Sequence, residues 1–271
     1  MTMERFLAAV VQMASGSRHD ANLERARTLI EQAAKRGAQL VVLPEVFAWR
    51  GQRAEEAGQA ESIPGPTTDA MASVARALRI HLCMGSILEH EPGELRSYNT
   101  SCLLGPGGDL LARYRKIHLF DVDLPGRVTV RESDARAPGT ETVVVPTELG
   151  VLGLSICYDL RFPELYRRLV RAGAEILLVP SAFTFTTGSA HWDVLCRARA
   201  IENQCYLLAA DQTGMSPHGF ADYGSSMIVD PWGTVVARAG EGEGVVLAEI
   251  DRSSLERVRR ELPCLSHARL D

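Results

Sequence analysis

Hydrophobic and polar positions follow one another in the N-terminal half of the chain in the order strand, helix, strand. Residues 6–12 form an apolar run typical of a buried strand, and residues 40–43 form another. Between them, residues 21–36 have the spacing of an amphipathic helix, with Asp20 as its N-cap and Gly37 as its stop signal. The pattern further predicts a helix over 69–78 and strands over 81–88, 98–104 and 109–114, the last two joined by a Gly-Pro-Gly-Gly turn.

The C-terminal half repeats this order of elements. We expect strands over 150–156, 176–179, 206–210, 225–229, 234–238 and 245–250, and helices over 163–172 and 190–203. Residues 41–44 also match 177–180 in sequence, and residues 101–113 share Ser, Pro, Gly, Ala and Arg in register with 226–238. Matches this short can arise by chance, so the repeated order of elements is the stronger indication of an internal repeat.

Two similar halves, each with a sheet and two helices, can bury the apolar faces of their sheets only against each other. The sequence therefore predicts an α/β fold, a four-layer α-β-β-α sandwich of two similar halves, with residues 1–271 as a single domain. No segment has the composition of a linker. Residues 55–62 and 131–138 are polar and irregular, and we expect them to be surface loops.

Composition narrows the classes of function. The net charge of -5, with scattered basic residues, argues against a nucleic-acid or anionic-membrane partner. No stretch approaches the roughly 18 apolar residues of a membrane span, and the first residues lead directly into a strand, so we expect a cytoplasmic enzyme acting on a small molecule. The 6 cysteines and 7 histidines lack the spacing of a metal site and no phosphate-binding loop is present, so we expect reduced thiols, no metal and no cofactor.

Three segments place reactive side chains at the ends of predicted strands. Glu45 follows a strand directly after Pro44, which ends sheet pairing. Lys116 follows a hairpin strand, and Cys157 stands where a buried strand gives way to a helix. Glu can transfer protons, Lys can stabilise a thiolate and an oxyanion, and a thiol can attack a carbonyl carbon. The three suit acyl transfer through a thiol, with a backbone N–H such as that of Tyr158 as a further oxyanion donor.

Each of these residues also has an ordinary interpretation. Most free cysteines are small buried hydrophobic residues, and a charged run such as that around Lys116 is usually an exposed face. A glutamate after a strand is often a solvated loop acid. A pairing of Cys157 with His118 or His191 would instead give a papain-like site, although the local sequence lacks the signature of that family.

Three segments resemble, in order, the catalytic motifs of the nitrilase superfamily of carbon–nitrogen hydrolases: residues 43–45, 114–121 and 156–165. The resemblance continues over residues 180–183, 191–192, 197–203 and 226–233, and so covers nearly the whole chain. Within the superfamily, the sequence is most similar to the amidase branch that includes omega-amidases and deaminated-glutathione amidases. The residues after Glu45, 46–51, depart from those expected of a typical omega-amidase.

The resemblance implies a catalytic triad of Glu45 as general base, Lys116 as oxyanion stabiliser and Cys157 as nucleophile. It also gives Glu132 a supporting role beside Lys116, where the residue pattern alone would leave a loop acid. Substrate-binding candidates are Tyr158, Ala182, Phe183, His191 and Trp192. Relatives of this kind dimerise, so the resemblance further implies a homodimer or a higher homo-oligomer.

The reaction implied is hydrolysis of a small carboxamide to a carboxylic acid and ammonia through a thioester on Cys157. The expected substrate is deaminated glutathione or an omega-amide of a 2-oxo acid. Two alternatives stay open: a nitrile hydrolase of the same superfamily, and a non-catalytic binding or scaffold protein on this fold. Turnover of an amide, or a thioester adduct on Cys157, would exclude the scaffold.

Overall fold

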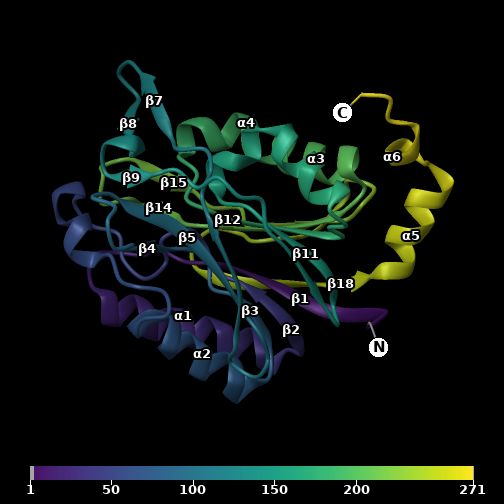
Figure 1. The fold of residues 1–271 in the computed structure, drawn as a ribbon, viewed down its shortest axis with the longest axis horizontal. Helices are drawn as coiled ribbons and strands as arrows, with labels where there is room; N and C mark the ends of the chain where they lie inside the picture. The colour runs from purple at the N-terminus through teal and green to yellow at the C-terminus, as the bar shows by residue number, and fades with distance from the viewer. Residues whose placement is uncertain (1–2, 271) are drawn as a thin grey trace.

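The computed structural model describes residues 3–270, whose elements form four layers (Figure 1). Helices α1 (His19–Lys35) and α2 (Pro66–Leu78) cover the outer face of one sheet. Helices α3 (Pro163–Arg171) and α4 (Phe185–Asn203) cover the outer face of the other. The two sheets pack against each other between these helices, so the predicted α-β-β-α sandwich is confirmed.

The first sheet contains eight strands: β1 (Arg5–Gln12), β2 (Ala38–Val42), β3 (His81–Cys83), β4 (Ile87–Glu89), β5 (Ser97–Leu104), β6 (Leu110–Arg115), β9 (Arg136–Ala137) and β18 (Gly244–Asp251). Strands β1, β2 and β3 are parallel neighbours. Strand β18 pairs antiparallel with β1, and β5 pairs antiparallel with β3 and β6. Residues 245–250, which the sequence pattern assigned to the C-terminal half, thus complete the first sheet.

The second sheet contains β10 (Val144–Thr147), β11 (Gly150–Leu154), β12 (Ile176–Ser181), β13 (Tyr206–Asp211), β16 (Met227–Val229) and β17 (Val235–Arg238). Its neighbours pair in the order antiparallel, parallel, parallel, antiparallel, antiparallel. The series β18-β1-β2-β3-β5-β6 of the first sheet has the same order of pairings. The repeat seen in the sequence is therefore also a repeat of topology.

Hydrophobic side chains on β1 alternate between the two faces of the first sheet. Ala8 and Val10 belong to the cluster shared with the second sheet, whereas Ala9 and Val11 belong to the cluster beneath α1 and α2. This is the two-residue period of a strand that is buried on both faces. The central strands of both sheets are thus fully enclosed, and their ends are fixed in place.

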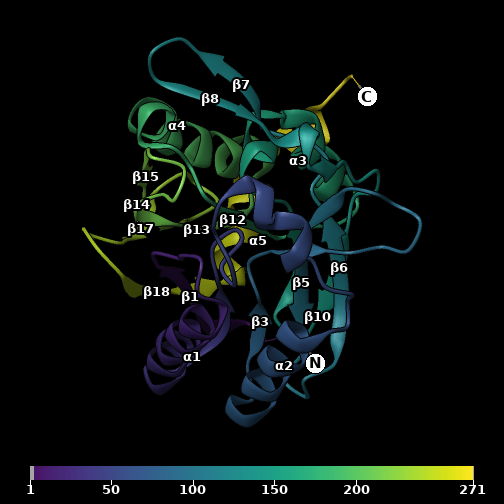
Figure 2. The same cartoon turned by 90° about the vertical axis from the view of Figure 1, so that its left-hand side faces the viewer.

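The remaining elements lie outside the two main sheets. Helices α5 (Arg252–Glu261) and α6 (Cys264–His267) follow β18, and β14 (Thr213–Met215) pairs with β15 (Ala221–Tyr223). Strands β7 (Asp121–Leu124) and β8 (Val128–Arg131) form a hairpin that extends away from the layers (Figure 2). Over residues 3–270, no helix has both the length and the apolar composition needed to cross a bilayer.

Several boundaries differ from those predicted. Helix α1 begins at His19, which places Asp20 in the first turn instead of at the N-cap. Helix α2 begins at Pro66, since proline suits the first helical turn. The predicted strand 81–88 is divided into β3 and β4 at Gly85, whose φ of 64° ends the first of them and where a Cβ would collide with the Pro44 carbonyl.

Residues 55–62 lie mostly at the surface, as predicted, and 131–138 are partly buried, but both segments are more regular than predicted. The first range lies partly in a 3₁₀ turn, Arg53–Gln59, and the second contains another, Glu132–Asp134, before β9. Glu56 and Glu132 are buried in them, and both bind the Arg136 guanidinium, at 2.9 and 2.6 Å. These ion pairs explain how the two acids are buried within otherwise polar segments.

Candidate active site

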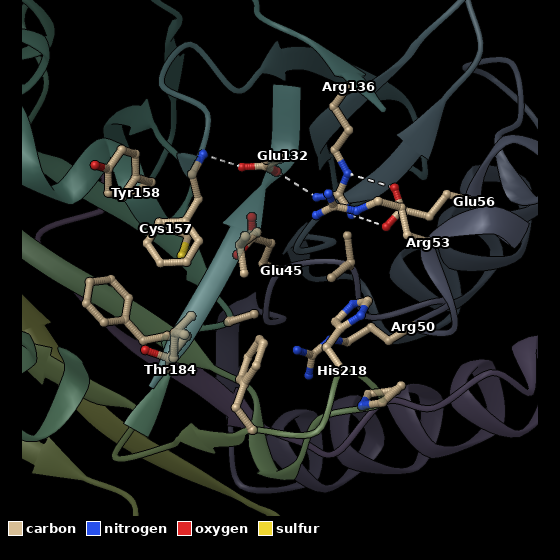
Figure 3. Close-up of a pocket in the computed structure, with 18 of the residues that line it drawn as sticks. Glu45, Arg50, Arg53, Glu56, Glu132, Arg136, Cys157, Tyr158, Thr184 and His218 are labelled. Carbon is tan, nitrogen blue, oxygen red and sulfur yellow. Dashed lines mark hydrogen bonds and ion pairs between the residues drawn. The ribbon is translucent and has the colours of Figure 1, made fainter. Parts of the chain in front are cut away.

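Four of the predicted residues converge on a cavity of about 450 Å³ at the ends of the central strands: Glu45, Lys116, Glu132 and Cys157 (Figure 3). Glu45 lies three residues beyond β2, Lys116 directly follows β6, and Cys157 follows β11. The cavity thus collects side chains from both sheets. A ligand site outside the carboxyl ends of the strands is a general property of open α/β sheets.

Lys116 lies where β5 changes its partner from β6 to β9. Its N–H donates to the Asn99 carbonyl at 2.9 Å, and its carbonyl accepts from the Gly139 N–H at 2.8 Å. The Lys116 side chain is only 2% exposed. Because the backbone is held on both sides, the long side chain is directed to one place.

The Lys116 ammonium joins the two carboxylates of the site. Its Nζ donates to Glu45 Oε1 at 2.8 Å and to Glu132 Oε2 at 2.9 Å. Asn99 Nδ2 also donates to Glu45 Oε1, at 2.7 Å, and reaches Glu132 Oε1 at 3.3 Å. Glu45 Oε1 therefore has two donors, which leaves Oε2 for the neighbouring thiol. Lys116 Nζ also donates to Glu132 Oε1 at 3.2 Å, so its three donor hydrogens face three carboxylate oxygens.

Ionisation of this cluster follows from its pairing. Burial alone would lower the pKa of Lys116, but Glu132 and Glu45 outweigh it and raise that pKa. Burial alone would raise the pKa of Glu132, but Lys116 and Arg136 lower it to about 2. The Phe120 N–H also donates to Glu132 Oε2 at 2.7 Å. Lys116 and Glu132 are consequently both charged at neutral pH.

Cys157 has a φ of 46°, a conformation that is unfavourable for residues other than glycine. Strand β11 ends at Leu154, two residues before the predicted end, and Cys157 opens a 3₁₀ turn, Cys157–Arg161. Asp159 holds this turn: its Oδ2 accepts from the Ile156 N–H at 2.9 Å and from Tyr114 Oη at 2.7 Å. The strained backbone is thereby tied to the strand that precedes Lys116.

The thiol is protonated in the resting site. Burial and the adjacent Glu45 carboxylate raise the pKa of Cys157 well above its ordinary value, and Lys116 and the Ala182 N–H oppose this only in part. Glu45, Lys116 and Ala182 are thus the neighbours that act on the thiol. A thiol beside a carboxylate and an ammonium can pass its proton to the carboxylate as it attacks an electrophile.

Three predicted substrate-binding residues line the cavity: Tyr158, Ala182 and Phe183. His191 and Trp192 do not. Trp192 is fully buried, and its indole N–H donates to the Ser225 carbonyl at 2.9 Å. Helix α4 begins at Phe185, five residues before the predicted start, so its first turn reaches the cavity and residues 191–192 lie one turn beyond it.

Arg161 is a half-buried cation of the cavity wall that the sequence analysis did not select. Its guanidinium lies 5.7 Å from the Tyr158 ring centroid and 5.2 Å from that of Phe183, and Nη1 is 3.1 Å from His191 Nδ1. Burial lowers its pKa. Within residues 3–270, no carboxylate lies within ion-pair distance of it. An available signal was its position one turn after Cys157.

Asn99 and Arg136 are two further polar residues of the site whose roles the sequence analysis did not assign. The spacing of four residues between Glu132 and Arg136 was a usable signal for an ion pair, although a strand-like segment gives it less weight than a helix would. In the part of the chain that the structure covers, no group of three His, Cys, Asp or Glu residues is arranged to hold a metal ion.

The four-layer fold, with a buried thiol, carboxylate and ammonium at its strand ends, is that of a carbon–nitrogen hydrolase. The family model for carbon-nitrogen hydrolases matches residues 7–260. The chain therefore belongs to this family, within the nitrilase superfamily, as its motifs predicted.

Two curated relatives are similar over almost their whole length. The deaminated glutathione amidase of Synechocystis is 44% identical over 268 residues, which are 98% of each chain. The omega-amidase of Mus musculus is 40% identical over 269 residues, 99% of this chain and 97% of that one.

Solved structures give the same result. The NitFhit protein of C. elegans has a TM-score of 0.92 and 40% identity over 99% of this chain, which corresponds to 66% of that larger chain. An amidase from Nesterenkonia, solved with an acetamide moiety attached to its active-site cysteine, has a TM-score of 0.80 and 27% identity over 95% of this chain and 95% of that chain.

Proposed function

We propose that this chain hydrolyses a small, negatively charged carboxamide through a thioester on Cys157. The observation that carries the proposal is the position of Glu45, a buried carboxylate that accepts a hydrogen bond from the Lys116 ammonium at 2.8 Å and lines the same cavity as the Cys157 thiol. A single carboxylate in that position can take the thiol proton and return it to the leaving group. In the amidase from Nesterenkonia, the active-site cysteine binds the acetamide moiety of fluoroacetamide covalently, which supports a nucleophilic thiol in this fold.

Acylation begins when Cys157 Sγ attacks the amide carbon and its proton passes to Glu45. The C–S bond forms while the carbonyl electrons move to oxygen, and the positive charge of Lys116, together with a backbone N–H, stabilises that oxyanion. The oxyanion then collapses, the C–N bond breaks, and the departing nitrogen takes the proton from Glu45. The product is a thioester and a free amine or ammonia.

Deacylation repeats these steps with water. Water gives a proton to Glu45 and its oxygen attacks the thioester carbon. The second oxyanion collapses with cleavage of the C–S bond, and the sulfur recovers the proton from Glu45. Glu132 keeps Lys116 in place throughout, since the two form a buried pair at 2.9 Å.

Arg161 supports an anionic acyl group as the preferred substrate. An unpaired, half-buried guanidinium in a cavity wall is suited to bind a carboxylate through two parallel hydrogen bonds. Deaminated glutathione and 2-oxoglutaramate both carry a carboxylate on the acyl side, and both would leave the same 2-oxoglutaryl thioester on Cys157. They differ only in the leaving group, which is cysteinylglycine for the first and ammonia for the second.

The test is a comparison of kcat/KM for deaminated glutathione, 2-oxoglutaramate and a simple nitrile. We expect turnover of at least one of the two amides and a 2-oxoglutaryl adduct on Cys157 by mass spectrometry. Cys157→Ala should show neither, with Cys157→Ser as a folded control. Full activity of Cys157→Ala would contradict the mechanism, and turnover of the nitrile alone would favour a nitrile hydrolase.

The role of Arg161 has a test of its own. Arg161→Gln should lower kcat/KM for 2-oxoglutaramate by roughly tenfold to a hundredfold, because a hydrogen-bonded charge pair of about 1.5–3 kcal/mol is lost. Butyramide, which has no carboxylate, should be hydrolysed at an unchanged rate. An equal loss on both amides would show that Arg161 serves the structure and not the acyl carboxylate.

The homodimer implied by the family resemblance stays a prediction. Light scattering of the purified protein measures it directly, and a monomer at micromolar concentration would contradict it.

A further inference from the structure

The cavity has two chemically different sides (Figure 3). Cys157, Tyr158 and Thr184 lie on one side, and Arg50, Arg53, Glu56 and His218 lie on the other, across Glu45. The half-buried Arg161 belongs to the first side, because it packs against the rings of Tyr158 and Phe183. The second side is a separate group of cations that the proposed acyl chemistry does not use.

Two of the three arginines on this second side are neutralised by carboxylates. Arg50 Nη2 donates to Asp222 Oδ1 at 3.1 Å within a buried ion pair. Arg136 binds both Glu56 and Glu132. These pairs are closed, so neither guanidinium is available to a ligand.

Arg53 is different. Its Nη1 donates to the Arg131 carbonyl at 2.5 Å, and the closest carboxylate oxygen, on Asp134, is 3.9 Å away. Among residues 3–270, Nε and Nη2 have no hydrogen-bond partner. The free edge made by these two atoms is the edge that binds a carboxylate with two parallel hydrogen bonds.

The pKa of His218 is further evidence of the electrostatic character of this side. Burial lowers its pKa, and the positive charges of Arg50, Arg136 and Arg53 lower it further, against the opposing effect of Glu56. The surroundings of His218 therefore favour negative charge, even though two of the three arginines are paired.

We propose that Arg53 forms a second anion subsite, which binds a carboxylate on the leaving-group side of the scissile amide. With Arg161 it brackets the reactive centre, so the preferred substrate carries a carboxylate on each side of the bond that is cleaved. Deaminated glutathione does so, through its oxo-acid and glycine carboxylates, whereas 2-oxoglutaramate has only the first. The cavity of about 450 Å³ lies within the range of about 300–1,000 Å³ that accommodates ligands larger than a simple amide. This inference rests on the proposed function of the site.

Binding separates the subsite from the chemistry. In the Cys157→Ala background, calorimetry would give the Kd of deaminated glutathione and of its analogue in which the glycine carboxylate is a carboxamide. We expect the acid to bind about tenfold to a hundredfold more tightly than the carboxamide. Adding Arg53→Gln should abolish that preference, and Arg53→Lys should retain part of it.

Arg96→Gln is the matched control. Arg96 is 42% exposed and Arg53 39%, both donate to a backbone carbonyl, and Arg96 lies outside the cavity. It should leave the preference unchanged. A preference that survives Arg53→Gln, or a wild-type site that binds acid and carboxamide equally, would overturn the subsite. Failure of the wild-type protein to hydrolyse either amide would instead overturn the proposed function, because the binding comparison does not depend on turnover.

Discussion

The two halves of the molecule have the same strand topology but contribute different side chains to the site. Strand registers match residue for residue: Leu40 pairs with His81 as Ile176 pairs with Tyr206, and Leu82 pairs with Leu104 as Leu207 pairs with Val229. By this correspondence Glu45 is equivalent to Ser181. The two residues also meet, since the Glu45 N–H donates to the Ser181 carbonyl at 3.2 Å.

The reactive residues have no reactive counterparts. The position equivalent to Lys116 is the exposed Glu241, and that equivalent to Asn99 is Gly224. The thiol of Cys157 corresponds to the buried Met13. One half therefore provides the carboxylate and the ammonium, and the other half provides the thiol. A fold with two similar halves has a single site because the site combines unlike positions of the repeat.

The connections after the equivalent strands β6 and β17 differ as well. Residues 239–243 lead directly from β17 into β18, whereas residues 116–143 lie between β6 and β10 and include the β7–β8 hairpin. This longer connection brings Glu132 back to Lys116. The sheets therefore determine where side chains can meet, and the longer connection adds the second carboxylate.

Substitution of Glu45, compared with substitution of its equivalent Ser181, should have the largest effect. Glu45→Gln should lower kcat by on the order of 10²–10⁴, because it removes the base that accepts the thiol proton. Ser181→Ala should change kcat less than about threefold, since its hydroxyl bonds only to the Val179 carbonyl at 3.3 Å. Amide hydrolysis, with circular dichroism to verify folding, measures both. Equal losses would contradict the asymmetry of the two halves.

Glu132→Gln tests the carboxylate that the longer connection provides. We expect kcat to fall on the order of 10² through misplacement of Lys116, and the free energy of unfolding at pH 7 to fall by about 3 kcal/mol. Asp134→Asn, an exposed acid of the same turn, is the control.

The pH dependence of that loss has a definite sign. The pKa of Glu132 is lowered in the folded protein from 4.5 to about 2, so its stabilisation is present above pH 4.5 and lost as the pH falls toward 2. Urea titrations should therefore show wild type and Glu132→Gln converging over this range. A difference that is independent of pH would contradict the charge pairing.

Asn99→Ala makes the first half resemble the second, where the equivalent position is a glycine. It removes one of the two donors to Glu45 Oε1, at 2.7 Å, and should lower kcat by roughly tenfold. Steady-state amide hydrolysis measures this change, and a kcat equal to that of wild type would contradict the role of Asn99.

The smallest effect concerns Asp211 and its counterpart Ser86. Ser86 Oγ accepts from the Val46 N–H at 2.9 Å, and Asp211 Oδ1 accepts from the Phe183 N–H at 2.8 Å. Burial raises the pKa of Asp211 well above its ordinary value, and its Oδ2 has no partner. A hydroxyl in one half and a buried carboxyl in the other thus each accept a backbone N–H just beyond equivalent strands, one position apart.

A raised pKa means that stability is highest below the ordinary pKa of 3.8 and falls as the pH rises through the folded value. Asp211→Asn should therefore gain about 1–3 kcal/mol over wild type as the pH rises, with little change in kcat. Ser86→Asp should show the reverse. Denaturant titrations from pH 4 to pH 8, as a rough range set by the carboxyl groups, would measure both changes.

The sequence predicted best what depends on local pattern. Glu45, Lys116 and Cys157 could be located because each follows an apolar run, and such runs become strands whose ends meet. Glu132 needed the family resemblance, since its burial depends on ion pairs with Lys116 and Arg136 that no local pattern reveals. Arg53 could not be selected because a free guanidinium edge is a property of the assembled cavity.

Two errors have related causes. Residues 245–250 were assigned to the half in which they lie in sequence, but β18 pairs with β1 at the opposite end of the chain. The start of α4 was predicted at residue 190, five residues later than the structure has it, and His191 and Trp192, which the family resemblance proposed for the cavity, lie outside its lining. The N-cap Thr184 accepts only a weak hydrogen bond from the Thr187 N–H, at 3.4 Å, and precedes apolar Phe185, so the sequence pattern marked the start poorly.

The pairing of β18 with β1 also determines when the protein can fold during synthesis. Arg5 pairs with Asp251 and Gln12 pairs with Gly244. Strand β1, the first to leave the ribosome, therefore cannot form this pairing until β18 has been synthesised. Domains usually fold as units during translation, and contacts between distant residues slow that process. The nascent chain must therefore carry β1 with an open edge, and the edge beside it closes only after residue 251 has emerged from the exit tunnel.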